Sequence, residues 1–168
     1  ADPPDIPEYT PPQKPEGGSY DFSRSEKLSN GLMYSIYSYY DPDGPILVAE
    51  LVIHKDPDAD PSATFSMEDY SHGEAPWNQP VGGMTPRYDS IFIASGVTGI
   101  GDYAFQGMDT VKKVTIQDPS TLKRVGAHAF EGDDKLEGPL DISGVTELGE
   151  AAFQNCSALG EVTLGEGL

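Results

Sequence analysis

Three aspartates at alternate positions are the strongest hint of chemistry in this sequence. Asp56, Asp58 and Asp60 match the first ligand positions of a calcium-binding loop. The match then fails, because the sixth position is Pro61 where the loop needs glycine, and the twelfth is Met67 where it needs glutamate. A solvated acidic turn is the simpler interpretation, and the sequence alone does not decide whether this turn binds calcium.

The histidines and the cysteine do not predict a reactive site. His54, His72 and His128 lack the spacing of zinc ligands, and no cysteine is near them in sequence. We expect His128 near the surface and Cys156 as a buried, unreactive thiol. A nucleophilic cysteine needs a base and an oxyanion hole, and no residue pattern suggests either. The sequence therefore predicts no catalytic residues, no metal, no cofactor and a non-enzymatic protein.

Composition excludes two classes of partner. The 168 residues include 28 acidic and 10 basic side chains, which gives a formal net charge of −18. Binding to nucleic acid needs a basic surface, so nucleic acid is a poor partner. The longest apolar runs, residues 46–49 and 51–53, are far below the roughly 18 residues of a membrane-spanning helix, so we expect no membrane insertion. The chain begins at Ala1 without methionine, and we expect a mature or trimmed product whose targeting segment is not present.

The chain divides into three predicted parts. Residues 1–19 contain six prolines and four acidic residues, which favours a disordered, extended tether. A proline-rich ligand for a partner domain is the alternative. Residues 20–88 are predicted to form a small antiparallel β cap, and residues 89–168 a repeat solenoid.

Within the cap, turn residues separate two β-rich segments. Residues 32–40 and 46–53 flank Asp-Pro-Asp-Gly-Pro at 41–45, which predicts a β-hairpin. Residues 66–70 are predicted to form a short helical turn with Ser66 as its N-terminal cap. The only tryptophan, Trp77, stands beside a predicted chain reversal.

A repeat dominates the second half of the chain. The block at residues 97–105 recurs at 122–130 and 145–153, so that Phe105, Phe130 and Phe153 are 25 and 23 residues apart. A short apolar strand follows each block, and one more strand precedes the first. A period of about 20–29 residues with one strand per unit is typical of a leucine-rich-repeat solenoid with parallel strands. Because no unit can bury its own apolar face, the three phenylalanines are predicted to form an internal column, and a glycine in each block to permit a tight corner.

The repeated motif resembles that of the BspA-type leucine-rich repeat family of bacterial surface proteins. The best-matching unit reads Leu148-Gly149-Glu150-Ala151-Ala152-Phe153-Gln154-Asn155-Cys156, followed by Leu159, Val162 and Leu164. The first two units have Met108 and Asp133 where the family has cysteine. Asp133 indicates that this position is near solvent in the second unit, or that the repeat is locally loosened. The resemblance covers about residues 30–168 and implies an exported or surface-attached protein for adhesion, without catalytic residues.

The outward positions of the solenoid strands are the predicted binding surface. Repeat proteins commonly bind along such a row, although an ordinary solvated face is the alternative for each residue. The candidate ligand-binding residues are Phe92, Lys113, Thr115, Gln117, Asp141 and Thr163. Phe92 is unusual, because an outward aromatic side chain costs solubility unless the cap covers it.

The alternative function is a carbohydrate-binding module that uses the aromatic residues of the cap. Four tyrosines fall in one predicted strand, at positions 34, 37, 39 and 40. Stacked aromatic rings can hold a sugar, but they also pack a small β core. The expected partner is thus a protein or a glycan, and the expected location is extracellular or at the cell surface. Since the last repeat has no polar cap, we also expect association through its open C-terminal end.

Overall fold

The protein is almost entirely β-structure. The computed structural model describes residues 6–11, 19–40, 47–80, 83 and 85–168, and for residues 19–23, 39–40 and 47–48 it describes the backbone alone. Among these residues the only helix is a single 3₁₀ turn, η1 (Pro76–Asn78). The predicted class, a mainly β solenoid behind an antiparallel cap, is therefore confirmed.

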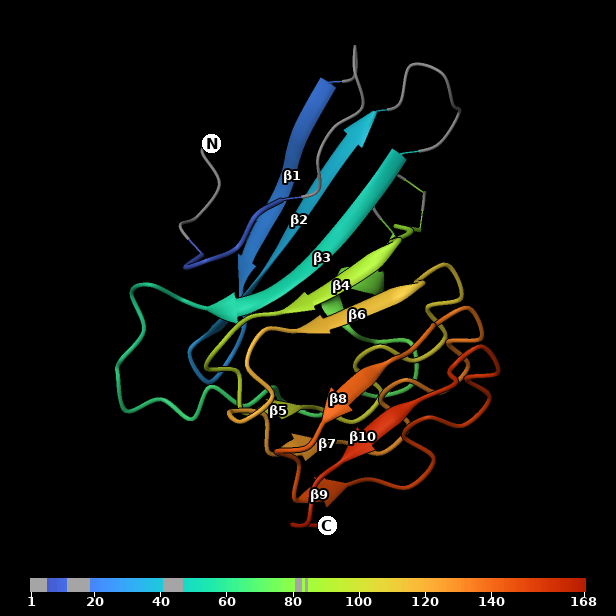
Figure 1. Cartoon of the computed structure of the whole chain (residues 1–168). Coiled ribbons are helices and arrows are strands. Elements are labelled where there is room, and N and C mark those ends of the chain that lie inside the picture. Colours follow the sequence, from blue (N-terminus) through green and yellow to red (C-terminus); the bar gives the residue numbers. More distant parts are fainter. Residues whose placement is uncertain (1–5, 12–18, 41–46, 81–82, 84) are drawn as a thin grey trace.

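One five-stranded sheet joins the cap to the solenoid (Figure 1). Its strand order is β1-β2-β3-β4-β6, antiparallel over the first three strands and parallel from β3 onward. The strands are β1 (Ser19–Lys27), β2 (Leu32–Tyr40), β3 (Leu47–Lys55), β4 (Ser90–Ile93) and β6 (Lys113–Ile116). The boundary that we propose between residues 88 and 89 falls just before β4, and the sheet continues across it.

Two smaller parallel sheets complete the solenoid of about three turns. One sheet contains the two-residue strands β5 (Gly99–Ile100), β7 (Arg124–Val125) and β9 (Glu147–Leu148). The other pairs β8 (Leu140–Ile142) with β10 (Val162–Leu164). Successive coils thus contribute one strand to each side of the stack, β4 with β5, β6 with β7 and β8 with β9, whereas the sequence predicted a single strand per unit.

The predicted hairpin is present, and a third strand extends it. β2 pairs with β3 in an antiparallel register that places Leu32 opposite Lys55. The predicted turn at residues 41–45 lies outside the described residues. β1, which the sequence analysis did not predict, pairs with the other edge of β2.

A column of stacked aromatic rings fills the centre of the solenoid, as predicted. The ring centroids of Phe105 and Phe130 are 5.3 Å apart, and those of Phe130 and Phe153 are also 5.3 Å apart. Trp77 adds a fourth ring, stacked 5.4 Å from Phe105, and its indole N–H donates to the carbonyl of Ala104. The tryptophan of the cap therefore closes one end of the column.

The repeated glycines allow the coils to approach closely. Gly101, Gly126 and Gly149 have no positive φ, so the expected tight corner does not explain them. A Cβ atom at any of the three would instead overlap the backbone of the preceding coil or of the cap. Glycine is required at these positions because the backbones of successive layers are in contact there and leave no room for a Cβ atom.

The predicted helical turn at residues 66–70 is wrong. Ser66 forms a parallel β-bridge with Gly99, and the Met67 N–H donates to the carbonyl of Gly99 at 3.0 Å. The Tyr70 N–H donates to the carbonyl of Asp102, also at 3.0 Å. Pairing with the first coil requires an extended backbone, so this cap segment adds one more layer to the stack.

The N-terminal segment differs from a solvated tether over residues 6–11. Ile6 is only 6% exposed, and it belongs to a small apolar cluster on the outer face of the five-stranded sheet. Residues 1–5 and 12–18 lie outside the described part of the chain. Proline content indicated an extended backbone, but the apolar side chains between the prolines find a surface to pack on.

Candidate interaction surface

The predicted outward row exists in two separate halves. In β4, Ile91 and Ile93 point into the core, whereas Phe92 between them points outward and is half-buried. Phe92 pairs with Thr115 on β6, and Asp141 on β8 pairs with Thr163 on β10. β6 and β8 belong to different sheets, so the row is interrupted between them.

The first half of the row, here called the covered half, includes Phe92, Thr115 and Gln117. The ring of Tyr9 packs on it at 4.8 Å from the ring of Phe92. The side-chain amide of Gln117 donates to the carbonyl of Pro7 at 3.2 Å. Phe92 is therefore covered by the N-terminal segment rather than by the cap sheet.

The second half, here called the open half, presents its side chains to solvent. Its residues Asp141 on β8 and Thr163 on β10 are exposed, as is Lys113 on β6, the strand that carries Thr115 of the covered half. The carboxylate of Asp141 accepts hydrogen bonds from Ser143, which lower its pKa. Asp141 is therefore ionised at neutral pH and offers a fixed negative charge beside β10.

Two of the four tyrosines that suggested a sugar platform are buried. Tyr34 and Tyr37 are 0% and 2% exposed, and they lie on opposite faces of β2. Tyr34 packs edge-on against Trp77 at 5.6 Å. The side chains of residues 39 and 40 lie outside the described part of the chain. Packing within the sheet therefore accounts for the described aromatic residues of this strand.

The acidic turn after β3 uses its carboxylates locally. Asp56 pairs with Lys27 at 2.8 Å and accepts the backbone N–H of Asp58. Asp60 accepts both the N–H and the hydroxyl of Ser62. Within the described residues, no group of three or more His, Cys, Asp or Glu side chains is placed to hold a metal ion.

His54 has a structural position on the outer side of the sheet. Its Nδ1–H donates to the carbonyl of Lys55, so that its Nε2 accepts the hydroxyl proton of Ser35 at 2.7 Å. Burial lowers the pKa of the imidazole, and the neutral ring is the form that this pair of bonds requires. His54 therefore provides a hydrogen-bond acceptor for the buried hydroxyl of Ser35.

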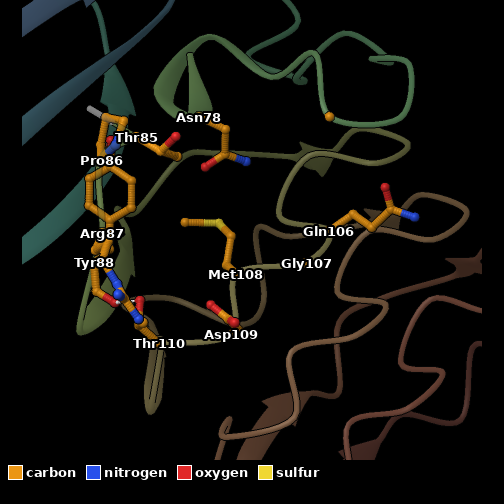
Figure 2. A pocket seen from close by; sticks show the side chains of 11 residues that line it. Asn78, Thr85, Pro86, Arg87, Tyr88, Gln106, Gly107, Met108, Asp109 and Thr110 are labelled. Atoms are coloured by element: carbon orange, nitrogen blue, oxygen red, sulfur yellow. Dashed lines mark hydrogen bonds between the residues drawn. The ribbon is translucent and has the colours of Figure 1, made fainter. Parts of the chain in front are cut away.

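Figure 2 shows a shallow groove of about 570 Å³ between residues 85–88 and the turn at 106–110. Met108 forms part of its floor, with Arg87 and Asp109 at its rim. The hydroxyl of Tyr88 donates to the carbonyl of Trp77, and the hydroxyl of Thr110 donates to the carbonyl of Tyr88. These polar groups hold the walls together, and the described residues of the lining include no cysteine, serine or histidine that could serve as a nucleophile with its base.

Asp133 is fully buried, so the prediction that this position is near solvent is wrong. Its Oδ1 accepts the backbone N–H of Met108 at 2.8 Å, while Oδ2 has no hydrogen-bond partner among the described residues. Burial is the main reason that its pKa is raised to about 9, with further contributions from Asp109 and Asp134. The carboxyl group is therefore protonated at neutral pH.

Cys156 occupies the equivalent position in the next coil. Its thiol donates to the carbonyl of Phe130 at 3.0 Å, and burial is the main reason that its pKa is raised to about 11. A thiol that stays protonated is a poor nucleophile. The local geometry therefore gives Cys156 a packing role.

Sequence reasoning missed the residues that cover the outer face. Ile6 and Tyr9 lie in the proline-rich segment, where only their apolar character, three residues apart, distinguishes them. It also missed Arg124, which binds the carboxylates of Asp69 and Asp102 at 2.8 Å each and ties the cap to two coils.

Stacked coils whose short strands pair in parallel from one coil to the next, closed by an antiparallel sheet, define a capped leucine-rich-repeat solenoid. The family described as "BspA type Leucine rich repeat region (6 copies)" matches residues 84–168, half of the chain. The chain therefore belongs to this family of leucine-rich repeat proteins. Searches of the curated proteins and of the solved structures gave no match. In the described part of the chain, no helix has the length and apolar character needed to cross a membrane.

Proposed function

We propose that this chain is a non-enzymatic leucine-rich repeat protein that is secreted or displayed at a cell surface and mediates protein interaction or adhesion. The repeat family supports this proposal, because its members are generally interaction scaffolds and are typically found at the cell surface. The single observation that carries it is the covered half of the outer row, where the sheet face already holds a peptide segment.

The six candidate residues would act in different ways. Phe92 supplies an aromatic surface, and Gln117 supplies an amide that already recognises a backbone carbonyl. Lys113 and Asp141 supply exposed charges of opposite sign, and Thr115 on β6 and Thr163 on β10 supply hydroxyl groups. A face of mixed polarity with an aromatic anchor is typical of protein interfaces.

The net charge affects the choice of partner. At −18, the chain repels acidic surfaces and attracts basic ones at long range. We propose that the partner presents a basic patch to the open half, around Asp141. Added salt would then lower the association rate more than it raises the dissociation rate, because salt screens the long-range attraction that brings the two proteins together.

A matched pair of charge reversals tests the proposal. Binding of the full chain to a panel of purified extracellular proteins is measured by surface plasmon resonance, with a glycan array in parallel. Asp141→Lys lies on the open half, whereas Glu147→Lys makes the same change at an exposed position on β9, in the other sheet. We expect Asp141→Lys to weaken binding of a protein partner at least about tenfold and Glu147→Lys to leave it within about twofold.

Two results would contradict this proposal. Equal losses for both variants would mean that net charge, not the outer row, determines binding. Binding to glycans alone would contradict a protein partner.

The same proposal includes association of copies through the open end of the stack. The last coil exposes three large apolar side chains, Leu148, Leu164 and Leu168, which are 39%, 55% and 50% exposed. Exposed apolar area at a strand edge favours pairing with another chain. Sedimentation velocity over a range of concentrations would detect it.

A further inference from the structure

A patch of side chains on the outer face of the sheet contacts residues 6–9 of the N-terminal segment. This patch, here called the outer-face patch, lies across β2, β3 and β4 and extends to the residue after β6. Its residues are Tyr37, Glu50, Val52, Phe92, Ala94 and Gln117. Figure 1 shows the blue trace of residues 6–11 beside this sheet.

Two side chains of the segment pack on the outer-face patch. Ile6 is 6% exposed and packs in the apolar cluster with Val52 and Ala94. The ring of Tyr9 lies 5.2 Å from that of Tyr37. An aliphatic residue and a tyrosine three positions later are therefore the two anchors.

A tight turn aims both anchors at the sheet. The Tyr9 N–H donates to the carbonyl of Ile6 at 3.1 Å, and Glu8 has a φ of +58°, in the left-handed region. This turn brings positions i and i+3 to the same side, while Pro7 and Glu8 between them remain exposed.

The outer-face patch also contributes specific polar contacts. The hydroxyl of Tyr9 donates to Oε1 of Glu50 at 2.6 Å, and Oε2 of Glu50 is held by the hydroxyl of Ser90 at 2.6 Å. Gln117 donates to the carbonyl of Pro7. Gln117 thus binds the peptide backbone, and Glu50 binds the phenol hydroxyl. The bond to Glu50 favours tyrosine over phenylalanine at the second anchor.

The segment binds without joining the sheet. Within the described residues, residues 6–11 belong to no β-ladder. Their hydrogen bonds to the sheet, from Tyr9 to Glu50 and from Gln117 to the carbonyl of Pro7, each involve a side chain. The segment can therefore leave while the strands beneath it stay paired.

We propose that the outer-face patch is a docking site for a peptide segment of another protein with an aliphatic-Pro-x-Tyr pattern, and that Ile6–Tyr9 is a built-in competitor for it. This inference rests on the proposed function, since the patch shares Phe92 and Gln117 with the covered half of the outer row. It adds the chemistry of the partner and predicts that the attached segment weakens binding to the intact chain.

The competition has a calculable size. A short linker gives an attached segment an effective concentration on the order of 1 mM. A free peptide with an intrinsic dissociation constant of about 0.1 mM would then bind the intact chain about tenfold more weakly than a chain whose own segment is released.

A labelled peptide tests this directly. The probe is the fluorescein-labelled hexapeptide Ile-Pro-Glu-Tyr-Thr-Pro, which has the sequence of residues 6–11, titrated by fluorescence anisotropy. The receptors are the intact chain and the full chain carrying Ile6→Ala with Tyr9→Ala. We expect at least about tenfold tighter binding to the double variant, and no binding of a peptide in which alanine replaces the tyrosine.

Three controls locate the site. Glu8→Ala changes an exposed residue of the same segment, so this variant should behave like the intact chain. Adding Phe92→Ala to the double variant should remove binding. Tyr9→Phe keeps the ring and loses the bond to Glu50, so this variant should bind the labelled peptide with an affinity between those of the intact chain and the double variant. It replaces the double variant in the test if that variant does not fold.

Other outcomes would overturn the inference. Equal affinity for the intact chain and for a folded released variant would show that the segment does not compete. Binding that survives Phe92→Ala would place the peptide elsewhere. Either result would leave the effect of Asp141→Lys on the panel untouched, so failure of this inference is distinguishable from failure of the proposed function.

Discussion

The interior column and the outer row each take one side chain from every coil, yet they differ in composition. Inside, the column holds Phe105, Phe130 and Phe153 in successive coils. Outside, the row changes from phenylalanine to threonine, aspartate and threonine. Stacking sets both positions, but only the interior demands a particular shape in every layer.

Exposure differs in the same way. The column is buried until its last ring, whereas the outer row changes from half-buried at Phe92 to exposed at Thr163. Substitutions inside should therefore reduce stability, and substitutions outside should change binding.

The column should give the largest loss of stability. Phe130 is 1% exposed and lies between two rings, so Phe130→Ala leaves a cavity that neighbouring coils cannot fill. We expect the free energy of unfolding to fall by about 3–5 kcal/mol, measured by urea denaturation.

Phe153→Ala is the matched control, because that ring is half-buried at the open end. Its cost should be clearly smaller than that of Phe130→Ala. Equal costs, or a loss below about 1 kcal/mol at Phe130, would contradict a closed column.

Asp133 should give an intermediate effect that depends on pH. Its pKa is raised from an ordinary 3.8 to about 9 in the folded chain, so the folded state keeps a proton that the unfolded state loses. Stability should therefore decrease as the pH rises from about 4 to about 9, by at most about 1.4 kcal/mol per pH unit. Asp133→Asn, which keeps an acceptor for the Met108 N–H, should be about 1–3 kcal/mol more stable at pH 7.

Urea denaturation of both proteins from pH 4 to pH 9 checks this. The advantage of the asparagine variant should shrink toward pH 4, where the carboxyl group is protonated in both states. An advantage of constant size across this range would show that the carboxyl group is not forced to stay neutral.

The sequence predicts the solenoid well because the same motif occurs three times, and each copy gives the same spacing of inward-facing residues. The spacing of Phe105, Phe130 and Phe153 indicates the coil length, and the apolar strands after each block indicate which side chains point inward. The role of the glycines was misassigned, since contact between layers cannot be distinguished from a turn in one dimension.

The outer face could be predicted only in part. Alternation within the strands placed Phe92 and Thr163 correctly on the outer side, since the period of a strand is two. Nothing in the sequence near Phe92 indicates Tyr9, because that contact spans 83 residues (92 − 9) and follows no repeat. Asp133 was also misplaced, because burial of a carboxyl group depends on layers above and below it.

The ring of Tyr9 holds the N-terminal segment against Phe92 on the outer row. A double-mutant cycle tests this contact most directly. The stabilities of the intact chain, Tyr9→Ala, Phe92→Ala and the double variant are measured by urea denaturation. Rings 4.8 Å apart should give a coupling energy of about 0.5–1.5 kcal/mol. Additive losses, with a coupling energy near zero, would mean that the N-terminal segment does not occupy this face.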